Sequence, residues 1–200
     1  MAPVNALKPY TDLKDPDRPQ DGQSYGRMTE ANAWVQDFTY IWFRGVWVYI
    51  ATVLDLKTRR VMGWGVGLRH DKALVHQAIL DALSKHPAPG ILHSDQGSEY
   101  LSILLRELCQ KMEITLSCSD RSSPWQNGFQ ERFYGTLKNY IYPVAKYRDL
   151  AELYEAVALS IYYYNYKRIH TALKMSPAAY AATLQPVDLR TDRVLQKRGA

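Results

Sequence analysis

Three acidic residues stand in contexts that suit metal-dependent chemistry. Asp37 lies inside an apolar and aromatic stretch, Asp95 lies in the phrase His93–Ser98, and Glu131 ends the phrase Pro124–Glu131. An Asp-to-Glu spacing such as that between Asp95 and Glu131 also arises by chance, so the spacing alone proves little. The surroundings of each carboxylate carry the argument.

Asp37 is surrounded by the aromatic and β-branched residues of 34–42. An ionised carboxylate is costly there unless it is paired or metal-bound. The alternative is a structural aspartate that binds backbone amides or an arginine, because structural pairs also perturb carboxylates. Asp95 follows the short apolar stretch Ile91–His93, and strand ends often present catalytic side chains. The alternative for Asp95 is an N-cap of a helix that begins near Ser98.

Glu131 is predicted to lie one turn into a helix, where its side chain shares a face with Asn127 and Lys138. Three converging carboxylates repel one another unless cations lie between them. Carboxylate oxygens without histidine or cysteine partners suit Mg²⁺, or Mn²⁺, rather than zinc. We therefore predict two ions, with Asp37 as the bridging ligand and Asp95 and Glu131 each favouring one ion. Such a pair stabilises both the attacking and the leaving oxygen of a phosphoryl displacement.

Two other acidic residues, Asp55 and Glu99, are less suitable as metal ligands. Asp55 ends an apolar stretch and precedes Lys57–Arg60, so we expect a turn or ion-pair residue there. Glu99 follows Asp95 by four residues and is expected in the first turn of a helix, where a carboxylate is favourable.

Composition narrows the class of protein. The chain has 200 residues, 46% of them hydrophobic, and a formal charge of +5 with a pI near 9.1. This favours one domain and indicates a polyanionic partner, although a merely basic soluble protein has the same charge. Cys109 and Cys118 form neither a disulfide framework nor a Cys-x-x-Cys pair. We expect a cytoplasmic protein, because neither a transmembrane run nor a signal peptide is visible.

Apolar periodicity predicts an α/β fold with a five-stranded mixed sheet flanked by helices. Strands are expected over 34–42, 47–54, 60–66, 91–93 and 114–118, the first three antiparallel. Helices are expected over 72–86, 98–112, 126–141 and 149–168, with a last helical turn opened by Ser176-Pro177. Residues 1–30 are predicted to form an arm or linker, 31–183 the core, and 184–200 a polar tail.

The chain resembles the catalytic core of retroviral-integrase-like transposases, and most closely those of bacterial insertion sequences. The matching blocks occur in family order over about residues 30–180: Trp34 with Asp37–Ile41, Asp55-Leu56 with Arg59 and Gly63-Trp64, His93–Ser98 with Tyr100, Ser123-Pro124, Asn127-Gly128, Glu131–Phe133, Leu137-Lys138, Tyr164-Asn165, Arg168, His170, Leu173 and Ser176-Pro177.

The resemblance implies a ribonuclease-H-like fold and a metal-dependent site formed by Asp37, Asp95 and Glu131. It implies cleavage of transposon ends and joining of their 3′ hydroxyls to target DNA, in a homodimer or larger synaptic assembly on the bacterial nucleoid. Such transposases usually carry a helix-turn-helix region before the core, which residues 1–30 do not supply. The chain is therefore expected to be an isolated core or to act with a separate end-binding polypeptide.

Two other functional classes remain open at the level of sequence. One is a non-catalytic DNA-binding or regulatory module, a truncated core that dimerises with a full-length transposase. The other is a ribonuclease H, which shares the metal chemistry but does not require the segment from Tyr164 to His170. The intact carboxylate triad favours an enzyme over the non-catalytic module.

Several residues are candidate DNA contacts. Between Arg121 and Lys174 there are eight Lys and Arg against four Asp and Glu, so positive charge concentrates around and after Glu131. Each candidate has a structural alternative: a solvated helix charge, a hydrophobic staple, or a link between the last helix and the sheet. The candidates are Lys138, Asn127, Trp125, Arg168 and His170.

Overall fold

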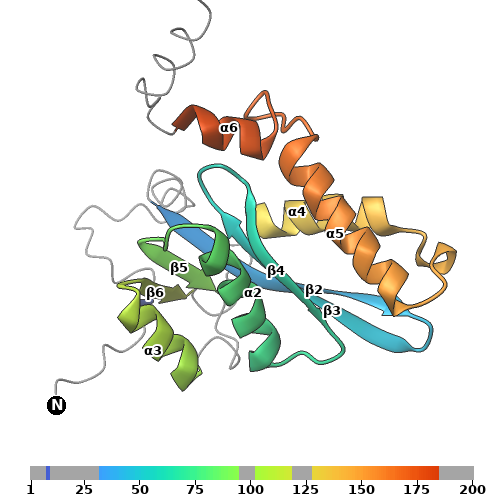
Figure 1. Ribbon diagram of the computed structural model, residues 1–200, viewed down its shortest axis with the longest axis horizontal. Coiled ribbons are helices and arrows are strands. Elements are labelled where there is room, and N and C mark those ends of the chain that lie inside the picture. The colour runs from blue at the N-terminus through green and yellow to red at the C-terminus, as the bar shows by residue number, and fades with distance from the viewer. Residues whose placement is uncertain (1–7, 10–31, 95–101, 119–127, 185–200) are drawn as a thin grey trace, which may run out of the picture.

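A mixed β-sheet organises the molecule (Figure 1). The computed structural model describes residues 8–9, 32–94, 102–118 and 128–184. In this part of the chain the strands lie in the order β1-β6-β5-β2-β3-β4. Their bounds are β1 Lys8–Pro9, β2 Ala33–Phe43, β3 Val46–Asp55, β4 Val61–Gly67, β5 Ile91–Ser94 and β6 Thr115–Cys118.

The pairing confirms the five predicted strands and their mixed directions. β2, β3 and β4 form an antiparallel meander, whereas β5 pairs parallel to β2 and β6 pairs parallel to β5. The two-residue strand β1, which was not predicted, pairs parallel to β6 at the sheet edge. In the described residues β5 pairs with β2 only over Ala33–Val35, so the remainder of β2 has its sheet partner, β3, on one side.

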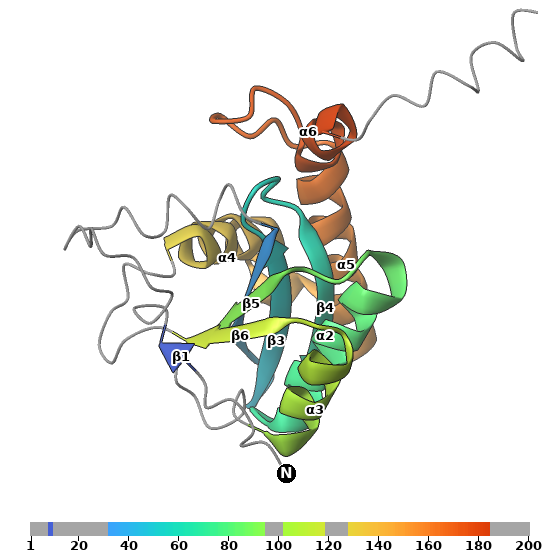
Figure 2. The same cartoon turned by 90° about the vertical axis from the view of Figure 1, so that its left-hand side faces the viewer.

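Helices cover both faces of the sheet. α2 (Lys72–Lys85) and α3 (Ile103–Lys111) lie together along one side (Figure 2). α4 (Gly128–Ile141) and α5 (Leu150–Tyr166) pack on the other face, and α6 (Pro177–Leu184) follows α5. A short 3₁₀ turn, η3 (Val144–Lys146), connects α4 to α5. Within the described residues, no helix has both the length and the apolar character that crossing a lipid bilayer requires.

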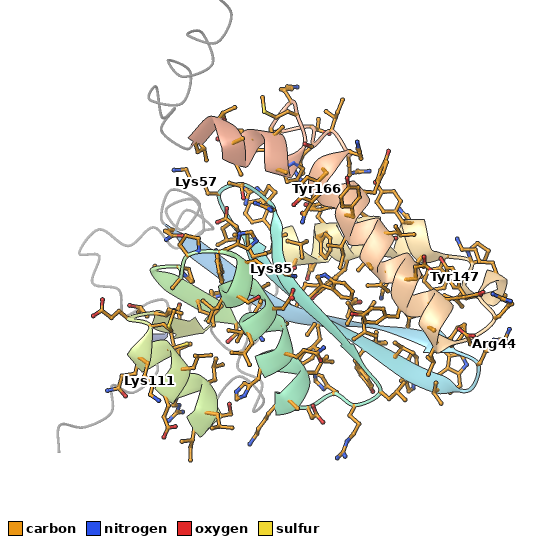
Figure 3. All side chains as sticks on the ribbon, viewed as in Figure 1. Arg44, Lys57, Lys85, Lys111, Tyr147 and Tyr166 are labelled. Atoms are coloured by element: carbon orange, nitrogen blue, oxygen red, sulfur yellow. The ribbon has the colours of Figure 1, made fainter. Side chains whose placement is uncertain are left out.

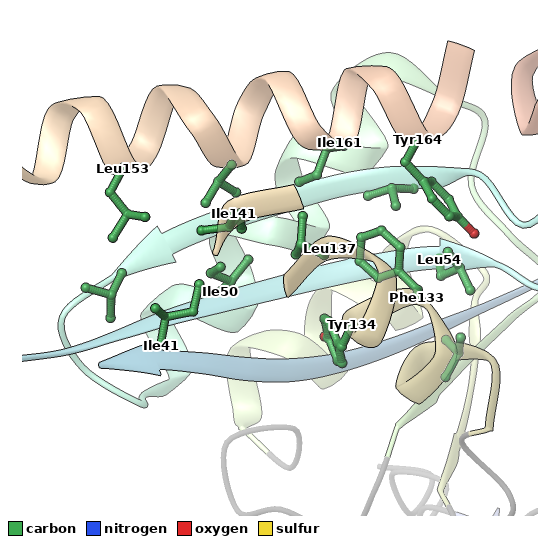
Figure 4. Packing of buried hydrophobic residues seen from close by; sticks show 14 of the residues in the cluster. Ile41, Ile50, Leu54, Phe133, Tyr134, Leu137, Ile141, Leu153, Ile161 and Tyr164 are labelled. Atoms are coloured by element: carbon green, nitrogen blue, oxygen red, sulfur yellow. The ribbon is translucent and has the colours of Figure 1, made fainter. Parts of the chain in front are cut away.

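The larger hydrophobic core lies between the sheet and the α4–α5 pair. Strand residues of odd number on β2 and even number on β3 point to this side, because side chains alternate along a strand. Figure 4 shows these strand residues facing the helices. The residues labelled there are Ile41, Ile50, Leu54, Phe133, Tyr134, Leu137, Ile141, Leu153, Ile161 and Tyr164.

Side-chain caps set the starts of three helices. Asp71 caps α2 and Asp149 caps α5, each by accepting from a backbone N–H three residues later. α3 begins at Ile103 rather than near Ser98, because Ser102 has extended backbone angles and accepts from Leu105 N. This helix therefore does not need Asp95 as its N-cap.

Candidate active site

Asp37 lies in the middle of β2, on the face of the sheet that α4 covers. It has the same strand parity as Val35 and Ile41, which belong to the core beneath α4. Its cross-strand partner on β3 is Thr52. The Asp37 side chain is half-buried, and its Oδ1 accepts a hydrogen bond of 2.8 Å from Phe38 N.

Gln130 fixes α4 to the sheet beside Asp37. Its side chain is fully buried, and its Nε2 donates to the backbone oxygens of Val35 at 3.0 Å and Thr52 at 3.3 Å. Thr52 Oγ1 donates to Gln130 Oε1 at 3.4 Å and also lies 2.9 Å from the hydroxyl of Tyr134. A polar network in the core thus joins β2, β3 and the first two turns of α4. The role of Gln130 is not predictable from the sequence, because nothing in its local pattern indicates burial.

Glu131 follows Gln130, so its side chain leaves α4 about 100° around the helix axis from that of Gln130. It lies in the first turn of the helix and is exposed to solvent. A carboxylate at this position is also favoured by the helix dipole, which provides a structural reason for an acidic residue there. The bond from Gln130 to Val35 thus holds the turn of α4 that contains Glu131 against β2, two residues along the strand from Asp37.

Asp95 lies outside the described residues, but the strand that precedes it is described. β5 ends at Ser94, and His93 pairs with Val35 of β2 on one side and Ser117 of β6 on the other. His93 is buried, and its Nδ1 lies 3.1 Å from Ser117 Oγ. Burial lowers the pKa of His93 to about 4, so the imidazole is neutral at neutral pH.

Asp55 is a turn residue, as predicted. Its carboxylate accepts hydrogen bonds from the backbone N–H of Thr58 at 2.9 Å and from the Thr58 hydroxyl. The turn places Arg59 in a left-handed backbone conformation, with φ of 62°. The guanidinium of Arg59 lies 3.4 Å from the ring centroid of Phe129, at the start of α4. Arg59 therefore brings positive charge to the first turn of α4, a placement that its basic neighbours in the sequence did not reveal. The second alternative acidic residue, Glu99, lies outside the described residues.

The end of α5 is bound to the sheet and to α4. Asn165 accepts from Val61 N and donates to Val61 O, both at 2.9 Å, so it continues the hydrogen bonding of β4. Arg168 donates from Nη1 to the hydroxyl of Tyr140 in α4 at 2.8 Å. The structural alternative for Arg168, a link to the rest of the fold, is thus present in the structure. Its contact with DNA stays a prediction.

His170 lies in a short loop that closes on itself through a bridge between His170 and Met175. Burial lowers its pKa, and three nearby guanidinium groups lower it further, those of Arg59, Arg168 and Arg132. The loop after α5 is therefore close to the basic residues at the start of α4. The side chain of His170 is mostly uncharged at neutral pH, because its pKa lies below the ordinary value of 6.5.

The other predicted DNA contacts fall in different places. Lys138 lies two turns beyond Glu131 on α4, and its Nζ is 5.3 Å from the ring centroid of Tyr40 on β2. It therefore reaches across the edge of β2 that β5 leaves uncovered. Asn127 and Trp125 lie outside the described residues.

The described donors suit a hard divalent ion in kind. Asp37 and Glu131 offer carboxylate oxygens, the ligands that Mg²⁺ prefers. Among the residues with assigned structure, no group of three His, Cys, Asp or Glu side chains is arranged to hold a metal ion. This part of the chain contains two of the three predicted ligands, because Asp95 is not among its residues.

Comparisons with known protein families and sequences agree with these features. Two family models, both described as Integrase core domain, match residues 29–124 and 112–177. The transposase for insertion sequence element IS904 of Lactococcus lactis is 35% identical over 143 residues, covering 70% of this chain and 56% of the relative. The putative transposase InsK for element IS150 of Escherichia coli is 31% identical, covering 74% of this chain and 53% of the relative. The chain thus spans about half the length of these curated relatives.

Solved structures share the fold. The catalytic core of HTLV-2 integrase in complex with magnesium matches with a TM-score of 0.64 and 18% identity, over 75% of this chain and 95% of that one. A chain of the simian T-cell lymphotropic virus intasome matches with a TM-score of 0.69 and 17% identity, over 79% and 56% respectively. These matches confirm the ribonuclease-H-like fold. The chain therefore belongs to the integrase core domain family and is similar to the transposases of bacterial insertion sequences.

Proposed function

We propose that this chain is the catalytic core of a DNA transposase, which cuts transposon ends and joins them to target DNA with two divalent ions. Asp37, Asp95 and Glu131 are the proposed ligands of these ions. The observation that carries the proposal is the bond from Gln130 to Val35, which holds the turn containing Glu131 against the strand containing Asp37.

Chain connectivity supports the third ligand. His93 pairs with Val35, and β5 runs parallel to β2. Beyond this pair, β2 continues towards Asp37 while β5 ends at Ser94. Asp95 is the next residue, and consecutive Cα atoms are about 3.8 Å apart. In the proposed site one carboxylate comes from β2, one from the residue that follows β5 in the chain, and one from α4.

The residues of the chain have separable roles in the proposed reaction. Two bound divalent ions would supply the charge that activates the attacking oxygen and stabilises the leaving oxygen of a phosphodiester. The carboxylates would bind these ions, and Gln130 holds the helix turn that contains Glu131 against the sheet. Lys138 on α4 and Arg59, which contacts Phe129 at the start of α4, are the proposed partners of DNA phosphates.

Binding of DNA is expected to depend on salt and to be weakly sequence-specific. Positive side chains gather where α4 begins and α5 ends, at Arg59, Arg132 and Arg168. Contacts with phosphates release counterions, so affinity falls as salt rises. An affinity that is equal at low and high salt would contradict these phosphate contacts.

A strand-transfer assay with a pre-cut DNA end tests the catalytic role. We expect Asp95→Asn to abolish joining that depends on Mg²⁺ or Mn²⁺ while DNA affinity stays nearly unchanged. Glu107→Gln is the matched control, because Glu107 is an exposed carboxylate on α3. Joining at the wild-type rate by Asp95→Asn would rule out the proposed site.

The assembly that acts on DNA is part of the proposal. Two ends must be brought together, so we propose a homodimer or larger synaptic complex on the bacterial nucleoid. Titration of metal in the strand-transfer assay with matched and scrambled ends tests catalysis and end specificity together. DNA binding without joining, at any metal concentration, would favour the non-catalytic regulatory module instead.

A further inference from the structure

A row of aromatic rings covers one face of the β2–β3 hairpin. The antiparallel register pairs Trp42 with Trp47 and Tyr40 with Tyr49, so their side chains lie on the same face. His70, which follows β4, extends the row towards the middle of the hairpin. We call this row the aromatic ladder; its members are Phe38, Tyr40, Trp42, Trp47, Tyr49 and His70.

Ring contacts make the aromatic ladder continuous. The centroids of Trp42 and Trp47 are 4.9 Å apart, and those of Tyr40 and Trp47 are 5.1 Å apart. Tyr40 and Tyr49 are 6.3 Å apart, and Tyr49 stacks on His70 at 5.5 Å. Phe38 ends the row, 4.3 Å from His70. Each ring thus fixes the orientation of the next, which leaves little conformational freedom to lose when a ligand binds.

The aromatic ladder is exposed although its rings could form a core. Tyr40 is 55% exposed, Trp42 49% and Trp47 45%. The opposite face of the same strands is buried, with Ile41 and Val48 in the core beneath α4 and α5. Figure 1 shows that the end of the hairpin extends beyond α2, the helix that covers this side of the sheet. Contiguous exposed aromatic surface of this kind marks an interaction site.

The hairpin is held in place on its other side. Arg44, at the hairpin turn, donates from Nη2 to the backbone oxygen of Tyr147 at 3.1 Å, and the two residues lie together in Figure 3. The turn is thereby tied to the connection between α4 and α5. The aromatic ladder is consequently a rigid surface rather than a row of side chains on a loose hairpin.

Charge indicates the kind of ligand that fits this surface. Residues 38–54 contain no acidic side chain, and Arg44 is their one charged residue. Lys138 adds a positive charge 5.3 Å from the ring centroid of Tyr40. Exposed aromatic rings beside positive charges suit single-stranded nucleic acid, because its bases stack on the rings while its phosphates meet the cations.

We propose that the aromatic ladder binds unpaired bases of single-stranded DNA next to the catalytic site. The inference rests on the proposed function, since it assigns a binding surface for the same substrate. Tyr40 follows Asp37 by three residues on β2, about 10 Å along a strand. The two side chains point to opposite faces, and Lys138 crosses the edge of β2 between these faces. A strand that leaves the carboxylates therefore passes Lys138 before it reaches the rings.

The proposal specifies single strands rather than duplex DNA. In a duplex the faces of the bases are already covered by neighbouring bases, so the rings of the aromatic ladder have no free base to stack on. Unpaired bases present both faces, and stacking on aromatic side chains tolerates any sequence. The competing occupant is a second copy of the chain, which would cover the rings by ordinary hydrophobic contact.

Photo-crosslinking of the wild-type protein tests the proposal without a mutation. The probe is an oligothymidylate that carries 5-iododeoxyuridine. Its length is about 16 nucleotides, the upper site size for a single-strand binding domain. The experiment is done in EDTA, so that metal binding plays no part. We expect cross-links at Tyr40, Trp42, Trp47 or Tyr49. Cross-links that fall entirely outside the hairpin would overturn the proposal.

Affinity measurements give an independent test. In the double variant Trp42→Val and Trp47→Val the β-branched side chains preserve strand propensity while the rings are removed. We expect affinity for oligothymidylate to fall at least about fivefold, with duplex affinity unchanged. Tyr162→Leu is the control, because Tyr162 is an exposed aromatic residue on α5 that pairs with Tyr166 rather than with the aromatic ladder. We expect this control to bind both probes like the wild type.

Three results of these measurements would count against the proposal. The first is unchanged affinity of the double variant for oligothymidylate in a protein that stays folded by circular dichroism. The second is an equal loss for single-stranded and duplex probes. The third is a wild-type protein that is a dimer and a double variant that is a monomer but binds single strands equally well. This result would assign the rings to contact between copies of the chain.

The failure of this inference can be told apart from failure of the proposed function. Binding to the aromatic ladder needs no carboxylate, so Asp95→Asn should give the same cross-links as the wild type. If Asp95→Asn abolishes joining and the cross-links fall elsewhere, only the aromatic ladder is wrong. If the cross-links fall on the hairpin and Asp95→Asn still joins DNA, only the catalytic assignment is wrong.

Discussion

Gln130 Nε2 lies 3.0 Å from the backbone oxygen of Val35, so the residue before Glu131 is bonded to the strand that carries Asp37. The bond is buried, and it is accompanied by a second one from the same nitrogen to Thr52 O. A helix held at this point cannot slide along the sheet without breaking both bonds. A neutral residue therefore fixes the helix that carries Glu131 against the strand that carries Asp37.

Removal of the Gln130 amide should destabilise the fold. Gln130→Met keeps the side-chain length but removes the donor to the buried carbonyl oxygens of Val35 and Thr52 and the acceptor of the Thr52 hydroxyl. We expect this loss to cost about 2 kcal/mol of unfolding free energy. Denaturant unfolding followed by circular dichroism measures the change. Asn139→Ala, at an exposed position of the same helix, should change stability by less than about 0.5 kcal/mol. Equal stabilities of the two variants would show that the network does not hold α4.

Two glycines should respond to alanine in opposite ways. A Cβ at Gly63 would lie 2.3 Å from Ala78 O and 2.4 Å from Ala82 N in α2, so Gly63→Ala must push the helix backbone away. We expect a loss of about 2 kcal/mol or more. At Gly135 nothing lies within 4 Å of an added Cβ, so Gly135→Ala should gain about 0.5–1 kcal/mol in helix propensity. Thermal unfolding of both variants measures the difference, and a stable Gly63→Ala protein would contradict the close approach of α2.

Divalent metal should stabilise the wild-type protein against unfolding. A ligand that binds the folded state alone adds about 2.7 kcal/mol at a concentration a hundred times its Kd. We expect Mn²⁺ to raise the Tm of the wild type and to raise that of Asp37→Asn far less. Glu155→Gln, which alters an exposed carboxylate on α5, should keep the wild-type response. The same rise in Tm for Asp37→Asn would remove Asp37 from the metal site.

Lys138 should contribute one phosphate contact to DNA binding. Each phosphate that is neutralised steepens the dependence of affinity on salt, so Lys138→Ala should lower the slope of log K against log salt by about 1. Binding titrations over a range of salt concentrations give the slope. Lys111→Ala, at the exposed end of α3, is the control and should leave the slope unchanged. An unchanged slope in Lys138→Ala would show that Lys138 contacts no DNA phosphate and only packs against Tyr40.

Cys109 should be protected from alkylation in the folded protein. Burial raises the pKa of its thiol to about 12, above the ordinary value of 9.0, so the thiol stays protonated at pH 8. In a Cys118→Ser background, iodoacetamide should label the chain only after unfolding. The thiol of the unfolded chain ionises at a lower pH than the thiol of the folded protein. The contribution of Cys109 to stability should therefore be fully present below pH 9 and be lost as the pH rises towards 12. Rapid labelling of the folded protein at pH 8 would contradict the burial of Cys109.

The sequence by itself determined the order of the elements and the type of the fold. Alternation of apolar residues predicted β2, β3 and β4, and the helical spacing from Lys72 onward predicted α2. Caps adjusted the boundaries: the start of α3 at Ile103 depends on Ser102. Such local patterns are readable because they follow from backbone geometry and from the burial of one face.

The tertiary structure decided how the candidate site is held together. That Gln130 binds β2, that Asn165 binds Val61 and that Arg59 lies on Phe129 depends on residues far apart in the sequence. The exposure of Trp42 and Trp47 likewise could not be foreseen, because aromatic residues on a strand predict burial unless a covering helix ends before it reaches them. A side chain's partners are set by packing between elements, and packing leaves no periodic trace in the chain.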